Sequence, residues 1–227
     1  MIEFSFYGSL LYDYSCSKIS YKYTTFSISL QQYATPGCLG SHEVKKSLSD
    51  ALDRMIAYEA KIPKDALMFC FLDNHDTATD DWENRFDRVL PVEAGNAAFV
   101  LTFLRRGLPL LFNGNEIADN ANNSFFGPVE HPARAAKTVD WARALQPAGQ
   151  QRLALVRKLA KMRHEDPIWS EGTMEWVTDG EANGIVAFTR TLGARKMLVA
   201  ANLTAKPATA GAAIGTLAPY SYLIKQL

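Results

Sequence analysis

Residues 67–72 read Leu-Met-Phe-Cys-Phe-Leu and are apolar without interruption. This run is too short for a helix and lacks the alternation of a half-exposed strand, so it predicts a strand covered on both faces, as in a parallel sheet. Residues 108–112 read Leu-Pro-Leu-Leu-Phe and predict a second such strand, with Pro109 near its start, where a missing N–H is tolerated. Residues 93–106 between them have helical apolar spacing, so the order is that of a βαβ unit.

Polar residues follow both predicted strands. The first strand leads into Asn74, His75 and Asp76, and the second leads into Asn115 and Glu116. Because the carboxyl ends of parallel strands meet at one edge, where α/β folds build their sites, we expect these side chains to share one mouth. A carboxylate beside an imidazole suits a ligand rich in hydroxyl groups and can stabilise a developing positive charge. On spacing alone, a buried and satisfied His–Asp pair is an equal alternative.

A change of pattern after Pro167 predicts a second domain. Residues 148–164 form a predicted helix with Leu153, Val156, Leu159 and Ala160 on its inner face. Four short strands follow, at residues 174–177, 184–191, 196–202 and 221–227, with Gly and Pro between them. The sequence therefore divides into an α/β part over residues 1–166 and a small antiparallel β-sandwich over residues 167–227.

Composition narrows the classes of partner and cofactor. The 24 basic and 24 acidic residues among 227 argue against nucleic acid as a main partner. No stretch reaches the roughly 18 apolar residues of a membrane span. The three cysteines lack the spacing of a disulfide framework or a zinc site, so no metal or cofactor is predicted. The N-terminus lacks a secretory signal, which predicts a cytoplasmic protein if the chain is complete.

Two motifs resemble those of one enzyme family. Residues 71–76, Phe-Leu-Asp-Asn-His-Asp, resemble the seventh barrel strand of the α-amylase family of glycoside hydrolases. Residues 107–117 resemble its eighth strand, usually written G-x-P-x-x-Y-x-G-Q-E, and residues 185–190 and 197–202 are similar to its C-terminal β-domain. The resemblance implies an α/β fold class: the C-terminal portion, about strands 6–8, of a (β/α)8 TIM barrel, followed by a small all-β sandwich.

The resemblance also implies roles for individual residues. Asp76 matches the carboxylate that fixes and distorts the sugar, and His75, with Asn74 in the same motif, matches a group that binds that sugar's hydroxyls. Glu116 matches a supporting position, and Asn115 stands where the family usually has Gln. Trp82 is a candidate for stacking on a sugar ring, with ordinary loop packing as the alternative.

Two essential segments of the family have no counterpart here. Retaining cleavage needs a nucleophile and an acid/base whose carboxyls lie about 5–5.5 Å apart, and a full barrel needs eight strands and about 250 residues. The chain is therefore interpreted as the C-terminal part of an α-glucan or malto-oligosaccharide hydrolase, inactive alone. The alternative is a non-catalytic carbohydrate-binding or assembly remnant. A barrel cut open has an unpaired sheet edge, which predicts self-association or pairing with a missing N-terminal barrel portion.

Overall fold

A computed structural model of the chain describes residues 56, 60, 67, 69–72, 86–121, 139–180 and 183–227. The helices in these ranges are α5 Phe86–Val89, α6 Val92–Leu104 and α7 Pro147–Glu165, with short 3-10 helices η2 Asn115–Ile117, η4 Trp141–Leu145 and η5 Pro167–Trp169. The strands are β1 Phe69–Cys70, β2 Leu108–Pro109, β3 Thr173–Val177, β4 Ile185–Leu192, β5 Arg195–Asn202, β6 Ala208–Thr209, β7 Thr216–Leu217 and β8 Tyr222–Gln226.

The predicted βαβ unit is confirmed. Strands β1 and β2 pair in parallel, with Phe69 opposite Leu108 and Cys70 opposite Pro109, and α6 lies between them in the sequence. The N–H of Leu110 donates to the carbonyl of Cys70 at 2.9 Å, which extends the pairing by one residue. Strand β2 is shorter than the predicted run over residues 108–112, and the prediction that it is covered on both faces is wrong, because its two residues are half-buried and Leu111 is exposed.

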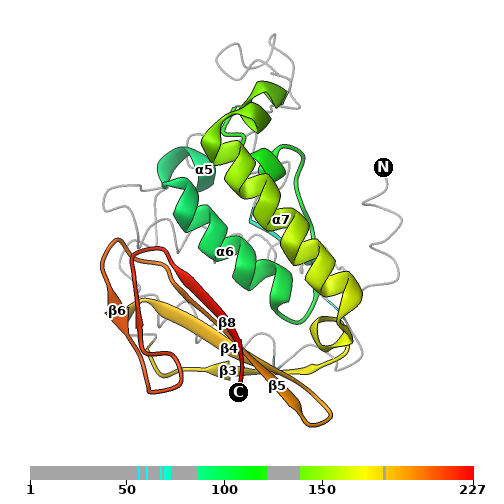
Figure 1. Cartoon of the computed structure of the whole chain (residues 1–227), viewed down its shortest axis with the longest axis vertical. Coiled ribbons are helices and arrows are strands. Elements are labelled where there is room, and N and C mark those ends of the chain that lie inside the picture. The colour runs from blue at the N-terminus through cyan, green and yellow to red at the C-terminus, as the bar shows by residue number, and fades with distance from the viewer. Residues whose placement is uncertain are drawn as a thin grey trace.

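Helix α6 is covered on all sides rather than on one face. The helical spacing of residues 93–106 predicts one inner face, but every residue from Ala94 to Leu104 is buried. Figure 1 shows the reason: α6 lies between α7 on one side and the four-stranded sheet on the other, and α6 and α7 run in the same direction. A helix that is apolar all round is typical of such a fully enclosed position.

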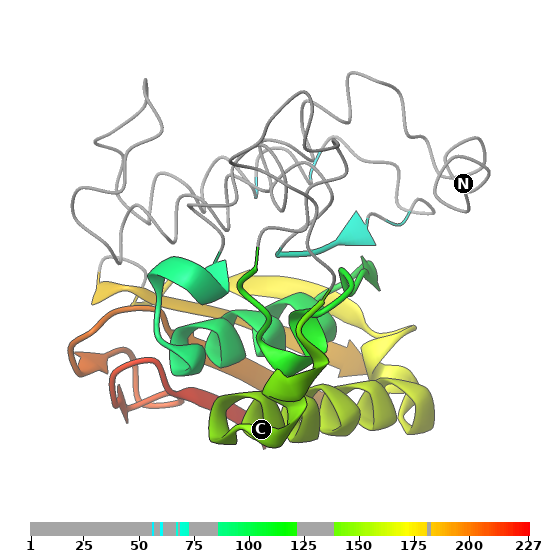
Figure 2. The same cartoon turned by 90° about the horizontal axis from the view of Figure 1, so that it is seen from above.

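The four strands predicted after Pro167 are confirmed as one antiparallel sheet in the order β3-β4-β5-β8. Successive residues of a strand point to opposite faces, so Val186 and Phe188 join the core around α6. Ile185 and Ala187 face the other way and pack with residues of the small β6–β7 sheet. Figure 2 shows the sheet running beside α6. The boundary near Asp166 stays a prediction.

The C-terminal end of α6 binds side chains from elsewhere in the chain. Arg163 of α7 donates from Nη1 to the carbonyls of Phe103, Arg105 and Trp169, and from Nη2 to that of Gly107. The last carbonyls of a helix have no partner inside it, so this guanidinium acts as a cap.

In the described part of the chain, no helix is long and apolar enough to cross a bilayer.

Arg105, which follows the last residue of α6, contacts the four-stranded sheet. Its side chain is buried, and its guanidinium carbon lies 5.5 Å from the ring centroid of Trp176 on β3. A cation at this distance from an indole face is favourable. Trp169 is also buried, in the core that α6, α7 and the sheet share.

Candidate functional site at the ends of the parallel strands

The parallel pairing of β1 and β2 puts the C-terminal ends of both strands at one edge. Asn115 and Glu116 follow β2 and belong to the described residues. Asn74, His75, Asp76 and Trp82 follow β1 in the sequence but lie outside the described residues, so their expected positions stay predictions. The structure therefore describes the side of the predicted mouth that β2 supplies.

The loop after β2 is held by its own backbone and by one carboxylate. Gly114 has a φ of 94°, in the left-handed region, and the short helix η2 that follows ends at Ala118, with a φ of 54°. The N–H of Gly114 donates to Oε2 of the half-buried Glu116 at 2.9 Å, and the N–H of Asp119 donates to the carbonyl of Gly114 at 2.9 Å. Glu116 thus shapes the turn directly.

Glycine is required at position 114 for a second reason. A Cβ added there would lie 2.9 Å from the Cβ of Asp119 and 3.3 Å from a methyl carbon of Val139. Positive φ and close approach together exclude an ordinary side chain at this turn. The loop conformation is therefore built into the sequence at one position.

Asn115 contributes its backbone to a buried charge network. The residue is 1% exposed, and its carbonyl oxygen accepts from Nη1 of Arg152 at 3.2 Å. Arg152 lies on α7, so the contact fixes the loop after β2 to a helix 37 residues further along the chain. The amide side chain is not part of this contact.

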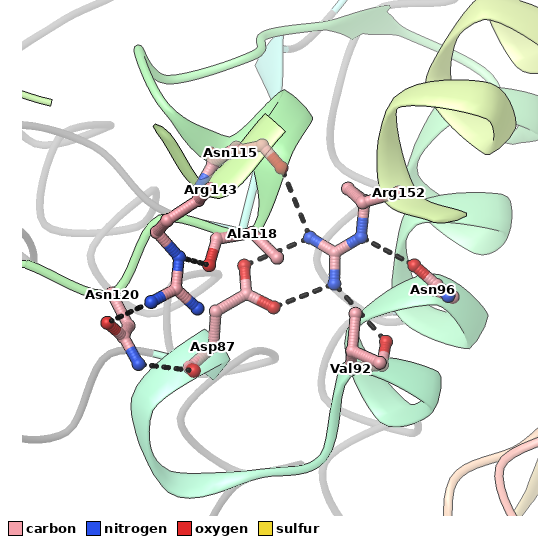
Figure 3. A network of polar contacts seen from close by, with 8 residues as sticks. All are labelled: Asp87, Val92, Asn96, Asn115, Ala118, Asn120, Arg143 and Arg152. Atoms are coloured by element: carbon pink, nitrogen blue, oxygen red, sulfur yellow. Dashed lines mark hydrogen bonds and ion pairs between the residues drawn. The ribbon is translucent and has the colours of Figure 1, made fainter. Parts of the chain in front are cut away.

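Arg152 is the centre of the network in Figure 3. Its guanidinium forms a two-pronged ion pair with Asp87 of α5, with Nη1–Oδ2 at 2.9 Å and Nη2–Oδ1 at 2.7 Å. Nε donates to Oδ1 of Asn96 at 2.5 Å, and Nη2 also donates to the carbonyl of Val92 at 3.3 Å. The two charged side chains are 0% and 3% exposed, so the pair is desolvated and its charges neutralise each other.

A second arginine holds the far end of the same loop. Nε of Arg143 donates to the carbonyl of Ala118 at 3.0 Å, and Nη1 donates to Oδ1 of Asn120 at 3.1 Å. The amide nitrogen of Asn120 in turn donates to the carbonyl of Asp87 at 3.4 Å. Figure 3 shows these residues between the loop and α5, so the loop after β2 and helix α5 are tied together at two points.

The sequence interpretation missed Arg152 and Asp87. The predicted inner face of α7 was partly wrong: Val156 and Leu159 are buried, but Leu153 is half-buried and Ala160 is exposed. The buried residues are Gly149, Arg152, Leu155, Val156 and Leu159. Their steps of three and four residues place Arg152 on the apolar stripe, a signal of a partnered internal charge that could have been read from the sequence.

The described residues contain no cluster of three His, Cys, Asp or Glu side chains suited to a metal. At this edge of the sheet, the loop after β2 carries the half-buried carboxylate of Glu116 and backbone carbonyls, and Arg143 and Arg152 hold it in place. Such groups accept hydrogen bonds from hydroxyls, and a rigid frame keeps their spacing constant.

Solved structures share the fold described above. Cyclic α-maltosyl-(1→6)-maltose hydrolase from Arthrobacter globiformis matches with a TM-score of 0.64 and 18% identity over 91% of this chain and 44% of its own. A debranching enzyme from Nostoc punctiforme matches with a TM-score of 0.62 and 16% identity over 90% of this chain and 45% of its own. A noncanonic maltogenic α-amylase from Thermotoga neapolitana matches with a TM-score of 0.57 and 22% identity over 70% and 34%.

The fold is that of α-amylase-type enzymes. This confirms, at the level of the fold, the resemblance indicated by the two strand-end motifs. The chain spans only about a third to a half of the length of these α-amylase-type structures. No protein-family model and no curated protein sequence matches the chain.

Proposed function

We propose that this chain carries the sugar-fixing part of an α-amylase-type glycoside hydrolase that acts on α-glucans or malto-oligosaccharides. The observation that carries the proposal is the parallel pairing of β1 and β2, because it directs both motif-bearing strand ends to one edge. The fold likeness to α-amylase-type enzymes supports it, among them a structure determined with maltotriose.

Within this proposal, Asp76 accepts hydrogen bonds from two sugar hydroxyls, and its negative charge favours the oxocarbenium-like state of the ring. His75 and Asn74 bind hydroxyls of the same sugar, and Trp82 stacks on a ring face. Asn115 and Glu116 support the mouth from the side of β2, where the carboxylate of Glu116 already accepts the N–H of Gly114.

The proposal assigns residues 1–166 to the C-terminal portion of a (β/α)8 barrel and residues 167–227 to a small β-domain. The nucleophile and acid/base carboxylates lie outside these 227 residues, so the chain alone binds sugar without cleaving it. An incomplete barrel sheet also has an unpaired edge, and pairing with a complementary barrel portion or a second copy would cover it.

Calorimetry with maltotriose and maltoheptaose tests the sugar site. We expect the full chain to bind, and Asp76→Ala to weaken binding by about tenfold or more, since a hydrogen bond to a charged group contributes roughly 1.5–3 kcal/mol. Asp81→Ala is the matched control, because it removes a carboxylate from the acidic stretch beyond the motif and should leave the affinity unchanged. Equal effects of the two variants, or no binding by the wild-type chain, would contradict the proposed site.

A chromogenic maltoside tests the proposed lack of cleavage. We expect no turnover by the full chain. Turnover that Asp76→Ala abolishes would show a competent enzyme, whereas sugar binding without turnover favours a non-catalytic carbohydrate-binding protein or a part that needs a partner.

A further inference from the structure

One buried guanidinium connects helix α5 to the loop after β2. Helix α5 carries Asp87 and follows His75 and Asp76 by about ten residues in the sequence. Asn115 opens the short helix η2 in the loop after β2. Arg152 binds both, through the carboxylate of Asp87 and the carbonyl of Asn115.

Arginine is the side chain that this position requires. Its five N–H groups have five acceptors here: two oxygens of Asp87, the side chain of Asn96, and the carbonyls of Val92 and Asn115. A lysine has three donors on one nitrogen and cannot form a planar two-pronged pair while also reaching the other acceptors. These five contacts therefore fix where the guanidinium of Arg152 lies, in addition to requiring its positive charge.

The surrounding packing leaves the guanidinium one place to lie. Its central carbon sits 4.6 Å from the ring centroid of Phe99. A Cβ added to Gly95 would collide with Nη2 of Arg152 and lie 2.7 Å from Oδ1 of Asp87. Helix α6 thus approaches the ion pair closely enough to exclude any side chain at position 95.

Stability alone does not require a charged pair at this place. Two desolvated charges gain little over well-packed apolar residues of similar volume, and buried ionic groups are better known for specifying one arrangement. We propose that Arg152 is a positioning residue for the sugar site, a role that rests on the proposed function: it sets the loop after β2, which carries Asn115 and Glu116, relative to helix α5.

The paired replacement Asp87→Leu with Arg152→Met tests this role, because it removes both charges and leaves neither unpaired. We expect this variant to keep a cooperative urea transition. We expect amide exchange at Ile117, Ala118 and Asp119, whose N–H groups bond within the loop, to become at least tenfold faster than in the wild type. Maltotriose should bind at least tenfold more weakly. Wild-type exchange and affinity in a folded paired variant would overturn the proposal.

Two further variants keep the test decisive. Arg152→Lys keeps a cation beside Asp87 without the planar fork, so loop exchange should still accelerate; if the paired variant does not fold, wild-type exchange in Arg152→Lys would overturn the proposal. Arg190→Met removes a buried arginine at the other end of α6 and should not accelerate the loop beyond any global change. If the wild-type chain binds no maltotriose, the proposed function fails, and the exchange data alone decide the role of Arg152.

Discussion

Arg190 and Leu104 join the sheet to the end of helix α6: Nη1 of the arginine donates to the carbonyl oxygen of Leu104 at 3.0 Å. Nη2 of the same guanidinium donates to the carbonyl of Gly172 at 2.8 Å, and the residue is 0% exposed. Burial, with Arg163 and Arg106 nearby, lowers the pKa of Arg190 to about 10, so the group stays charged at neutral pH. A cation at a helix C-terminus is favoured by the helix dipole.

Replacing this arginine should weaken the junction between helix and sheet. Arg190→Met leaves the carbonyls of Leu104 and Gly172 without this donor in a buried place, at about 1–3 kcal/mol each, so we expect the free energy of unfolding to fall by roughly 2–6 kcal/mol. Urea denaturation at pH 7 measures it. Arg190→Lys keeps a charge and one donor and should lose less. A loss below about 1 kcal/mol in Arg190→Met would contradict the role.

Asn202 organises the connection from β5 to β8. Its amide nitrogen donates to the carbonyls of Lys206, Leu217 and Ala218, and its Oδ1 accepts from the N–H and the hydroxyl of Thr204. Asn202→Asp puts an acceptor where three carbonyl oxygens need a donor. We expect a loss of roughly 3 kcal/mol or more in the free energy of unfolding, since the residue is fully buried.

The thermal midpoint of the Asn202→Asp protein, followed by circular dichroism, checks this expectation. Asn183→Asp is the control: that amide also donates to a carbonyl, of Thr209, but the residue is exposed, so its effect should be small. Equal shifts for the two variants would show that burial is not the cause.

Cys70 should be chemically inert in the folded chain. Desolvation by burial raises the pKa of its thiol to about 12, against the smaller opposing effect of Arg163, Arg106 and Arg190. Because the thiolate is the reactive form, iodoacetamide at pH 8 should not modify Cys70 until the protein unfolds. Mass spectrometry of a Cys16→Ser, Cys38→Ser background follows this single thiol, and rapid labelling without denaturant would count against the buried strand.

Asp166 and Arg195 form a pH-dependent contact beside η5. Arg195 donates to both carboxylate oxygens, at 3.0 and 2.7 Å, and this hydrogen bonding lowers the pKa of Asp166 below its ordinary value of 3.8. A depressed carboxyl pKa in the folded state means that the contribution to stability is full above pH 3.8 and is lost as the pH falls below it.

The stability difference between wild type and Asp166→Asn should therefore shrink as the pH drops below 3.8. It should also shrink in 1 M salt, because both side chains of the ion pair are partly exposed. Chemical denaturation from pH 6 to pH 2.5 measures the difference. Because Asn can also cap the N–H of Ile168, the variant removes the charge and keeps the cap, so an acid-independent difference would contradict the ion pair as its source.

Local patterns in the sequence determined the element order. The structure confirms the strands that local patterns predicted. These patterns are the apolar runs at residues 67–72 and 108–112 and the alternating segments after Pro167. The reason is that periodicity and turn residues act over a few positions, which a single chain displays directly. Asn74, His75, Asp76 and Trp82 stay predicted site residues, and Asn115 and Glu116 are those of the predicted set that the structure describes.

Only the tertiary structure decided where the arginines go and how many faces of α6 are covered. Arg152, Arg163 and Arg190 bind groups up to 86 residues away in sequence, and although spacing places Arg152 on a buried face, nothing near it in the sequence identifies those groups. A charged side chain can be buried only when distant acceptors surround it, so its place depends on the completed packing of helices against the sheet.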